Sequence, residues 1–318
     1  MKIVVLDGNT LNPGDLSWDP IGSQGNLTVY PRTQPDDVLP RIGDAQAIFT
    51  NKVLITREIL LACPSVKYVG VLATGYNVVD TAAARELGVT VTNVPAYSTA
   101  CVAQMVFALL LELCHRTGHH SDSVHAGRWN GCADFCYWDF PLTELAGKTM
   151  GIVGYGSIGR AVAKIARAFG MEVLACGGAH PVVSDEFVAG ATLEQVLSQS
   201  DVISLHCPLN DRSREIINAR SIAGMKDGVL LINTARGPLV AEADLRAALD
   251  SGKVAGAGLD VLCQEPPREG SPLIGAPNCI ITPHIAWAPV QARTRLMQIA
   301  ADNLWAWREG RPVNVVNP

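Results

Sequence analysis

The chain has 318 residues, a length that usually holds two domains. Hydrophobic residues make up 48% and charged residues 17%, which excludes a mainly disordered chain. The 25 basic and 30 acidic residues give a net charge of −5, which argues against a nucleic-acid partner.

The first 98 residues alternate short β-branched runs with helical stretches, as in a parallel sheet that helices cover. The strands are expected at 3–6, 27–30, 47–50, 68–72 and 89–92, with helices at 56–62 and 79–87. The opening apolar run stops at Asp7 and is too short for a signal peptide.

Ser98 and Thr99 introduce an apolar helix that is expected to end near Arg116. Gln104 and Glu112 interrupt its apolar run, which is shorter than the roughly 20 residues of a membrane span. Residues 118–141 are rich in aromatic side chains and predict an irregular, partly buried segment.

A second α/β unit follows and predicts a second parallel sheet. Its strands are expected at 149–153, 172–176, 202–205, 229–233, 255–260 and 279–282, and the last helix at 289–308. The nine cysteines form no CxxC pair and are expected to be reduced thiols. We therefore expect a soluble cytoplasmic protein with no membrane partner.

The segment from Gly154 to Gly159 fits the GxGxxG pattern between a strand and a helix. In that context Gly154 allows the tight turn, Gly156 lets the backbone approach a pyrophosphate, and Gly159 lets the helix pack on the strand. The pattern predicts a dinucleotide site, although an unrelated α/β protein can carry the same glycine turn.

The carboxylate that usually follows the second strand of such a site is missing, because 172–176 leads into Gly177. Residues 176–184 contain no Arg or Lys, so only His180 could contact a 2′-phosphate there. The sequence leaves the choice between NAD and NADP open and predicts a weak preference, within about tenfold in kcat/KM.

Four further motifs follow the glycine turn in order. They are Leu-His-Cys-Pro-Leu at 205–209, Asn-Thr-Ala-Arg-Gly at 233–237, Gly-Leu-Asp-Val at 258–261 and Thr-Pro-His-Ile-Ala-Trp at 282–287. With 72–77 and 102–104, they resemble the D-isomer-specific 2-hydroxyacid dehydrogenases over essentially the whole chain. Ala73-Thr74-Gly75, Trp138 and Trp287 are similar to the glycerate dehydrogenase and hydroxypyruvate reductase branch.

The resemblance implies two Rossmann-like parallel-sheet domains. Residues 1–98 and 289–318 would form a flavodoxin-like substrate domain, and residues 99–288 a dinucleotide-binding domain. It also implies a homodimer, with Trp138 at a subunit contact near an active-site mouth; the alternative is that Trp138 belongs to the core of its own chain.

The same resemblance implies that Arg236, Glu265 and His284 are the catalytic set. Reduction of a 2-keto acid needs a proton donor for the carbonyl oxygen, and an imidazole beside a carboxylate can serve. A guanidinium can hold the substrate carboxylate through two parallel hydrogen bonds. Alternatively, Arg236 pairs with a structural carboxylate, Glu265 is a loop charge and His284 is a structural histidine.

The resemblance, together with the glycine turn, also assigns further positions to the two ligands. The cofactor set is Thr99, Gly154, Gly156, Ser157, Ile158, Gly159, Gly177, Cys207, Pro208, Thr234, Ala235 and Asp260, with Asp260 facing the nicotinamide amide. The substrate set is Ala73, Thr74, Gly75, Arg236, His284 and Trp287. Cys207 could instead be a core thiol, and 73–75 a plain glycine turn. No metal site is predicted, because the histidines and cysteines show no ligand spacing.

The sequence thus predicts an NAD(P)-dependent oxidoreductase that acts on a small 2-keto or D-2-hydroxy acid, with hydroxypyruvate or glyoxylate as substrate and D-glycerate as product of the former. The alternative is a non-catalytic, dinucleotide-sensing interaction protein on the same fold. A formate enzyme would need its own pocket residues, of which the sequence gives no sign.

Overall fold

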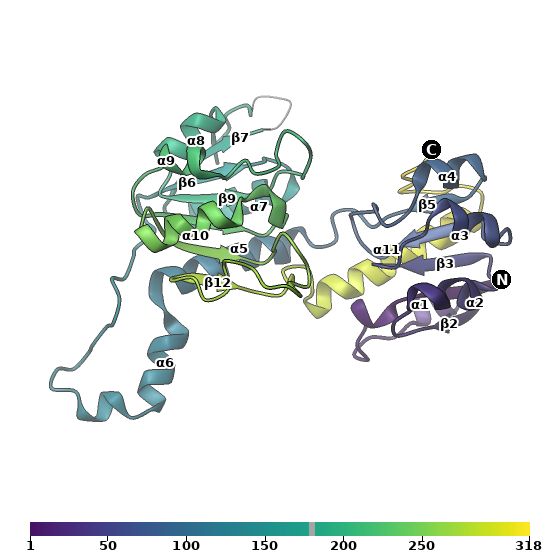
Figure 1. The fold of residues 1–318 in the computed structure, drawn as a ribbon, viewed down its shortest axis with the longest axis horizontal. Coiled ribbons are helices and arrows are strands. Elements are labelled where there is room, and N and C mark those ends of the chain that lie inside the picture. The colour runs from purple at the N-terminus through teal and green to yellow at the C-terminus, as the bar shows by residue number, and fades with distance from the viewer. Residues whose placement is uncertain (178–181) are drawn as a thin grey trace. The chain divides into compact units, whose positions relative to one another are not determined.

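The computed structural model describes residues 1–177 and 182–318, so His180 lies outside the described residues. The described chain divides into two compact units, Met1–Ser98 with Trp287–Pro318 and Thr99–Ala286. Figure 1 shows a sheet with helices in each of them. Each unit is described by itself below.

The first unit has a five-stranded parallel sheet in the order β2-β1-β3-β4-β5, which is the flavodoxin-like order. Its strands are β1 (Lys2–Val5), β2 (Asn26–Val29), β3 (Ala47–Thr50), β4 (Tyr68–Val71) and β5 (Thr90–Thr92). Its helices are α1 (Asp19–Gly22), α2 (Val38–Ile42), α3 (Arg57–Ala62), α4 (Thr81–Glu86) and α11 (Val290–Arg308). β3 and β4 are buried along their whole length, as expected for central strands covered on both faces.

The C-terminal helix α11 belongs to this first unit and packs against α1 and β4. Its Arg293 is buried and bonds both carboxylate oxygens of Asp15, at 2.7 and 2.6 Å. A two-pronged pair of this kind fixes orientation as well as distance, so it anchors the returning helix to the N-terminal segment.

The second unit has a seven-stranded parallel sheet in the order β12-β11-β10-β9-β6-β7-β8. Its strands are β6 (Thr149–Val153), β7 (Glu172–Cys176), β8 (Ala189–Gly190), β9 (Val202–Leu205), β10 (Val229–Asn233), β11 (Val254–Leu259) and β12 (Cys279–Ile281). Its helices are α5 (Thr99–His115), α6 (Thr117–His125), α7 (Ser157–Ala168), α8 (Leu193–Gln199), α9 (Ala219–Ala223) and α10 (Glu242–Ser251). The order reverses between β6 and β9, where open α/β sheets bind ligands at the carboxyl ends of their strands.

Both faces of this second sheet carry a core. One includes Val106 of α5 and Val162 of α7, and the other includes Val196 of α8 and Leu245 of α10. The predicted class of two parallel-sheet α/β units is therefore confirmed.

The segment that was expected to be irregular and partly buried differs from that prediction. Residues Thr117–His125 form helix α6, and Arg128–Gly131 form a 3-10 turn. No residue from 117 to 142 is buried, and Figure 1 shows this part extending away from the second unit's sheet. Over the described residues no single helix could cross a membrane by length and composition; α5 and α6 meet that test only together, across a bend of 57°.

Candidate active site

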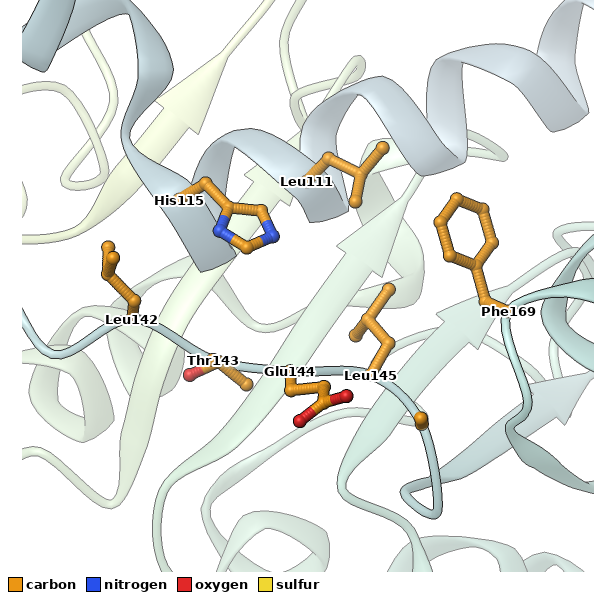
Figure 2. A pocket seen from close by; sticks show the side chains of 8 residues that line it. Leu111, His115, Leu142, Thr143, Glu144, Leu145 and Phe169 are labelled. Atoms are coloured by element: carbon orange, nitrogen blue, oxygen red, sulfur yellow. The ribbon is translucent and has the colours of Figure 1, made fainter.

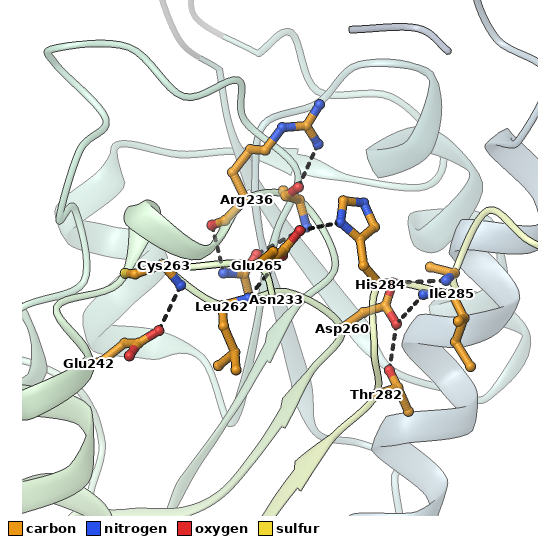
Figure 3. Close-up of polar contacts among 12 residues, drawn as sticks. Asn233, Arg236, Glu242, Asp260, Leu262, Cys263, Glu265, Thr282, His284 and Ile285 are labelled. Carbon is orange, nitrogen blue, oxygen red and sulfur yellow. Dashed lines mark hydrogen bonds and ion pairs between the residues drawn. The ribbon is translucent and has the colours of Figure 1, made fainter. Parts of the chain in front are cut away.

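Three neighbouring strands of the second unit bring the predicted catalytic side chains to one edge of the sheet. Arg236 follows β10, Asp260 follows β11 and His284 follows β12, and these strands are adjacent in the order β12-β11-β10. Glu265 lies in the loop after β11. Because the strands are parallel, their carboxyl ends meet at one edge, and Figure 3 shows the side chains gathered there.

His284 and Glu265 form a direct pair, with 2.6 Å between Nδ1 and Oε2. The other carboxylate oxygen, Oε1, accepts a hydrogen bond from the backbone N–H of Leu262 at 3.0 Å. The side chains are 32% and 35% exposed, so the pair is open to a ligand. Because Nδ1 faces Glu265, Nε2 is the nitrogen left to exchange a proton with a substrate.

Asp260 holds the turn that carries His284. Its side chain is buried, and its oxygens accept hydrogen bonds from Thr282 Oγ1, from the backbone N–H of Ile285 at 2.9 Å and from that of Ala286 at 2.8 Å. The sequence assigned Asp260 to the cofactor and missed this positioning role. The sequence signal, a carboxylate directly after a buried strand, does not show which strand end lies beside it.

Arg236 leaves β10 in a turn that Asn233 closes. The Asn233 side chain accepts from Ala235 N at 3.0 Å and donates to Arg236 O at 2.9 Å. The guanidinium donates to the carbonyl of Ala235 at 2.7 Å, and no carboxylate among the residues described by the structure forms an ion pair with it. The exposed guanidinium therefore keeps donors for an anionic ligand, unlike an arginine paired with a structural carboxylate.

The glycine turn after β6 has the geometry that a dinucleotide requires. Gly154 has φ +101°, and a Cβ there would lie 2.4 Å from Cys207 N. A Cβ on Gly159 would lie 2.3 Å from the carbonyl oxygen of Gly154. A Cβ on Gly156 would meet nothing within 4 Å of the described chain, so this glycine borders open space.

Helix α7 begins at this turn. Among the described residues no side chain caps it, and its first turn, which contains Ser157 and Ile158, has no acidic residue. Such a helix N-terminus suits a pyrophosphate, so the residues present fit a bound dinucleotide.

Thr234, directly after β10, is a second indication of a ligand site. This residue is 9% exposed, and its Oγ1 is buried with no hydrogen-bond partner within the described chain. Buried hydroxyls nearly always form a hydrogen bond, so an unpartnered one indicates a place where a ligand or a water binds. Cys207 is buried in the core of the second unit, and burial raises the pKa of its thiol, which fits the core-thiol alternative.

Other predicted positions are placed as follows. In the second unit, Thr99 begins α5, Gly177 follows β7, and Pro208 and Ala235 follow β9 and β10. In the first unit, Ala73, Thr74 and Gly75 follow β4, where Ala73 O accepts from Val94 N at 3.0 Å and Thr74 Oγ1 donates to Val94 O at 2.8 Å. Trp287 also belongs to the first unit.

A pocket of about 530 Å³ lies elsewhere on the second unit. Figure 2 shows it between α5 and the strip that leads to β6, and its lining is Leu111, His115, Leu142, Thr143, Glu144, Leu145, Ala146 and Phe169. None of the predicted site residues lines it. Across residues 1–177 and 182–318, no group of three or more His, Cys, Asp or Glu side chains could hold a metal ion.

Comparison with known proteins places this geometry in a family. Residues 107–286 match the model of the D-isomer specific 2-hydroxyacid dehydrogenase, NAD binding domain. The chain is 54% identical to a hydroxypyruvate reductase of Blautia hydrogenotrophica over 100% of both chains. It is 42% identical to a glycerate dehydrogenase of Methylorubrum extorquens over 99% of this chain and 98% of that one.

A solved structure shares the fold. It is an acyclic imino acid reductase in complex with NADPH and D-Arg, with a TM-score of 0.86 and 29% identity over 99% of this chain and 100% of that one. The match to an NAD-binding family favours the enzyme over the non-catalytic alternative. The chain belongs to the D-isomer-specific 2-hydroxyacid dehydrogenases, which are NAD(P)-dependent oxidoreductases.

Proposed function

We propose that this protein reduces hydroxypyruvate and glyoxylate, giving D-glycerate from the former. The observation that carries the proposal is the pair of His284 and Glu265 beside an arginine with no carboxylate partner in the described chain. The similarity to a hydroxypyruvate reductase over the full length of both chains supports the choice of substrate.

In this proposal each side chain has one task. Bound NADH or NADPH supplies the hydride for C2 of the keto acid. The two outer nitrogens of Arg236 hold the substrate carboxylate, and His284 gives the proton on Nε2 to the carbonyl oxygen. Glu265 keeps the ring oriented through Nδ1, while Asp260 fixes the turn below it.

The second unit would bind the dinucleotide, through the glycine turn and Thr99, Gly177, Cys207, Pro208, Thr234 and Ala235. The backbone N–H groups of 73–75 and the ring of Trp287, both in the first unit, are proposed to contact the keto acid.

The deciding experiment is a panel of 2-keto acids given with NADH and with NADPH. We expect the near-ultraviolet absorbance of the reduced cofactor to fall with hydroxypyruvate and glyoxylate, and more slowly with pyruvate. Cofactor binding without turnover of any keto acid would instead support the dinucleotide-sensing alternative.

We also propose a homodimer in which the segment 117–142 contacts the partner subunit. Trp129, Phe135 and Trp138 are 51%, 89% and 63% exposed, which is unusual for large aromatic side chains outside an interface. The exposure of Trp138 speaks against the alternative that its own chain buries it. Sedimentation analysis of Trp138→Ala should show weaker association than Trp305→Ala, which removes an equally large exposed side chain from α11.

A cytoplasmic location is part of the proposal. None of the nine cysteines, all of which lie in the described part of the chain, forms a disulfide, as is usual in a reducing compartment. Fractionation of the source cells would test it.

A further inference from the structure

The adenosine end of the dinucleotide site lacks its usual discriminating carboxylate, because β7 runs into Gly177. The fold nevertheless brings two opposite charges to the glycine turn. They are Arg160, in the first turns of α7, and Asp185, which lies one residue beyond the segment 176–184.

Tyr155 connects these charges to the turn. The parallel pairing of β6 and β7 sets Val153 opposite Cys176, and Gly154 N donates to Cys176 O at 2.9 Å, so Tyr155 follows the turn beside the end of β7. Its hydroxyl donates to Asp185 Oδ2 at 3.3 Å, and the guanidinium of Arg160 stacks on its ring at 4.4 Å. Burial and the nearby Asp185 raise the pKa of the Tyr155 phenol, which keeps it a donor.

The Asp185 side chain is held by the backbone of the residues that follow it. Its Oδ1 accepts hydrogen bonds from Phe187 N at 2.8 Å and Val188 N at 3.0 Å, so only Oδ2 faces the turn. That oxygen lies 4.0 Å from Arg160 Nη1. The two side chains are 38% and 59% exposed, so this pair contributes little to stability and both charges stay accessible to a ligand.

We propose that Arg160 and Asp185 set the choice between NADPH and NADH. The guanidinium attracts a 2′-phosphate, and the carboxylate repels that phosphate and offsets the guanidinium. With both charges present the preference between NADPH and NADH is weak. Removal of Asp185 leaves the attraction by Arg160, and removal of Arg160 leaves the repulsion by Asp185. The inference rests on dinucleotide binding, which the family shows, and is independent of which keto acid is reduced.

The test measures binding of ADP-ribose and of 2′-phospho-ADP-ribose by calorimetry, with kcat/KM for NADH and NADPH as a second readout. Asp185→Asn should shift the affinity ratio about tenfold toward the phosphorylated ligand, and Arg160→Gln about tenfold toward the other. The double variant should return to within about threefold of the original ratio.

Glu186→Gln is the matched control. Glu186 is the next residue, is exposed, and makes no hydrogen bond or ion pair with any described residue, so its loss changes the charge of the loop alone. Tyr155→Phe keeps the ring under Arg160 and removes only the hydrogen bond to Asp185. It should therefore shift the ratio of the two nucleotide affinities less than Asp185→Asn does.

Single variants that leave the ratio within twofold, or that shift it no more than Glu186→Gln, would overturn the proposal. If no keto acid is reduced but the nucleotide ratios move as expected, the proposed substrate is wrong and the cofactor assignment stands.

Discussion

His284 is held from two sides, through its ring by Glu265 and through its turn by Asp260. Its φ of +55° lies in the left-handed region, which is uncommon for a residue with a side chain. Backbone strain of this kind persists where surrounding bonds over-determine it, and it gathers at functional sites. The three hydrogen bonds that Asp260 accepts supply that restraint, so the strained turn aims the imidazole.

Replacement of His284 by Ala should lower kcat for hydroxypyruvate by about 10²- to 10⁴-fold, because proton donation acts in the transition state. The affinity for ADP-ribose should stay within about twofold. His115→Ala is the control. It removes an exposed imidazole from the pocket between α5 and the segment that leads to β6, and it should leave both the kcat and the ADP-ribose affinity unchanged. Activity of His284→Ala within threefold of the original protein would remove this residue from the catalytic set.

Glu265→Gln keeps the shape of the side chain and removes its charge. The carboxylate orients the imidazole through its contact with Nδ1, and a neutral amide in its place weakens that restraint on the ring. The kcat for hydroxypyruvate should therefore fall by at least about tenfold, while the affinity for ADP-ribose stays within about twofold. An unchanged kcat would contradict a catalytic role for Glu265.

Thr234→Val tests the unpartnered hydroxyl. The substitution removes a buried polar atom that has no partner in the described chain, so the thermal midpoint of the protein without cofactor should not fall. If a bound dinucleotide satisfies that hydroxyl, the affinity for NADH should drop by about tenfold. A lower midpoint with unchanged NADH affinity would mean that the hydroxyl serves the fold.

At the scale of elements, the helices and strands that are buried were the ones that the sequence predicted. The strands at 47–50, 172–176, 202–205 and 229–233 have the predicted bounds, because each is an apolar or β-branched run covered on both faces. The two-residue strand β8 has no such run and was not predicted. Helix α6 was missed for the same reason: it buries no residue, so it has no apolar stripe to detect.

The site also has a part that the sequence predicts and a part that it does not. The residues within motifs could be proposed from the sequence, since a motif fixes its own local turn. The pairing of Asp260 with the 282–286 turn and of Asp185 with Tyr155 could not, because each depends on which strand ends the fold makes neighbours. The segment 176–184 contains no carboxylate, and Asp185 lies one residue beyond it.

At the scale of the whole molecule, the chain passes from the first unit to the second at Thr99 and returns at Trp287. Each unit has its own parallel sheet and its own buried core. A ligand that binds the native form of one unit stabilises that unit by mass action. The adenosine half of the cofactor should therefore stabilise one unit against unfolding and leave the other unchanged.

Hydrogen exchange can measure this difference. ADP-ribose at a hundred times its Kd stabilises the unit that binds it by about 2.7 kcal/mol, which slows exchange through unfolding of that unit about a hundredfold. We expect this slowing in β6, β9 and β10 of the second unit and almost none in β3 and β4 of the first. Equal slowing in all five strands would show that the units unfold as one cooperative body, and slowing confined to the first unit would reverse the proposed assignment of the dinucleotide to the second.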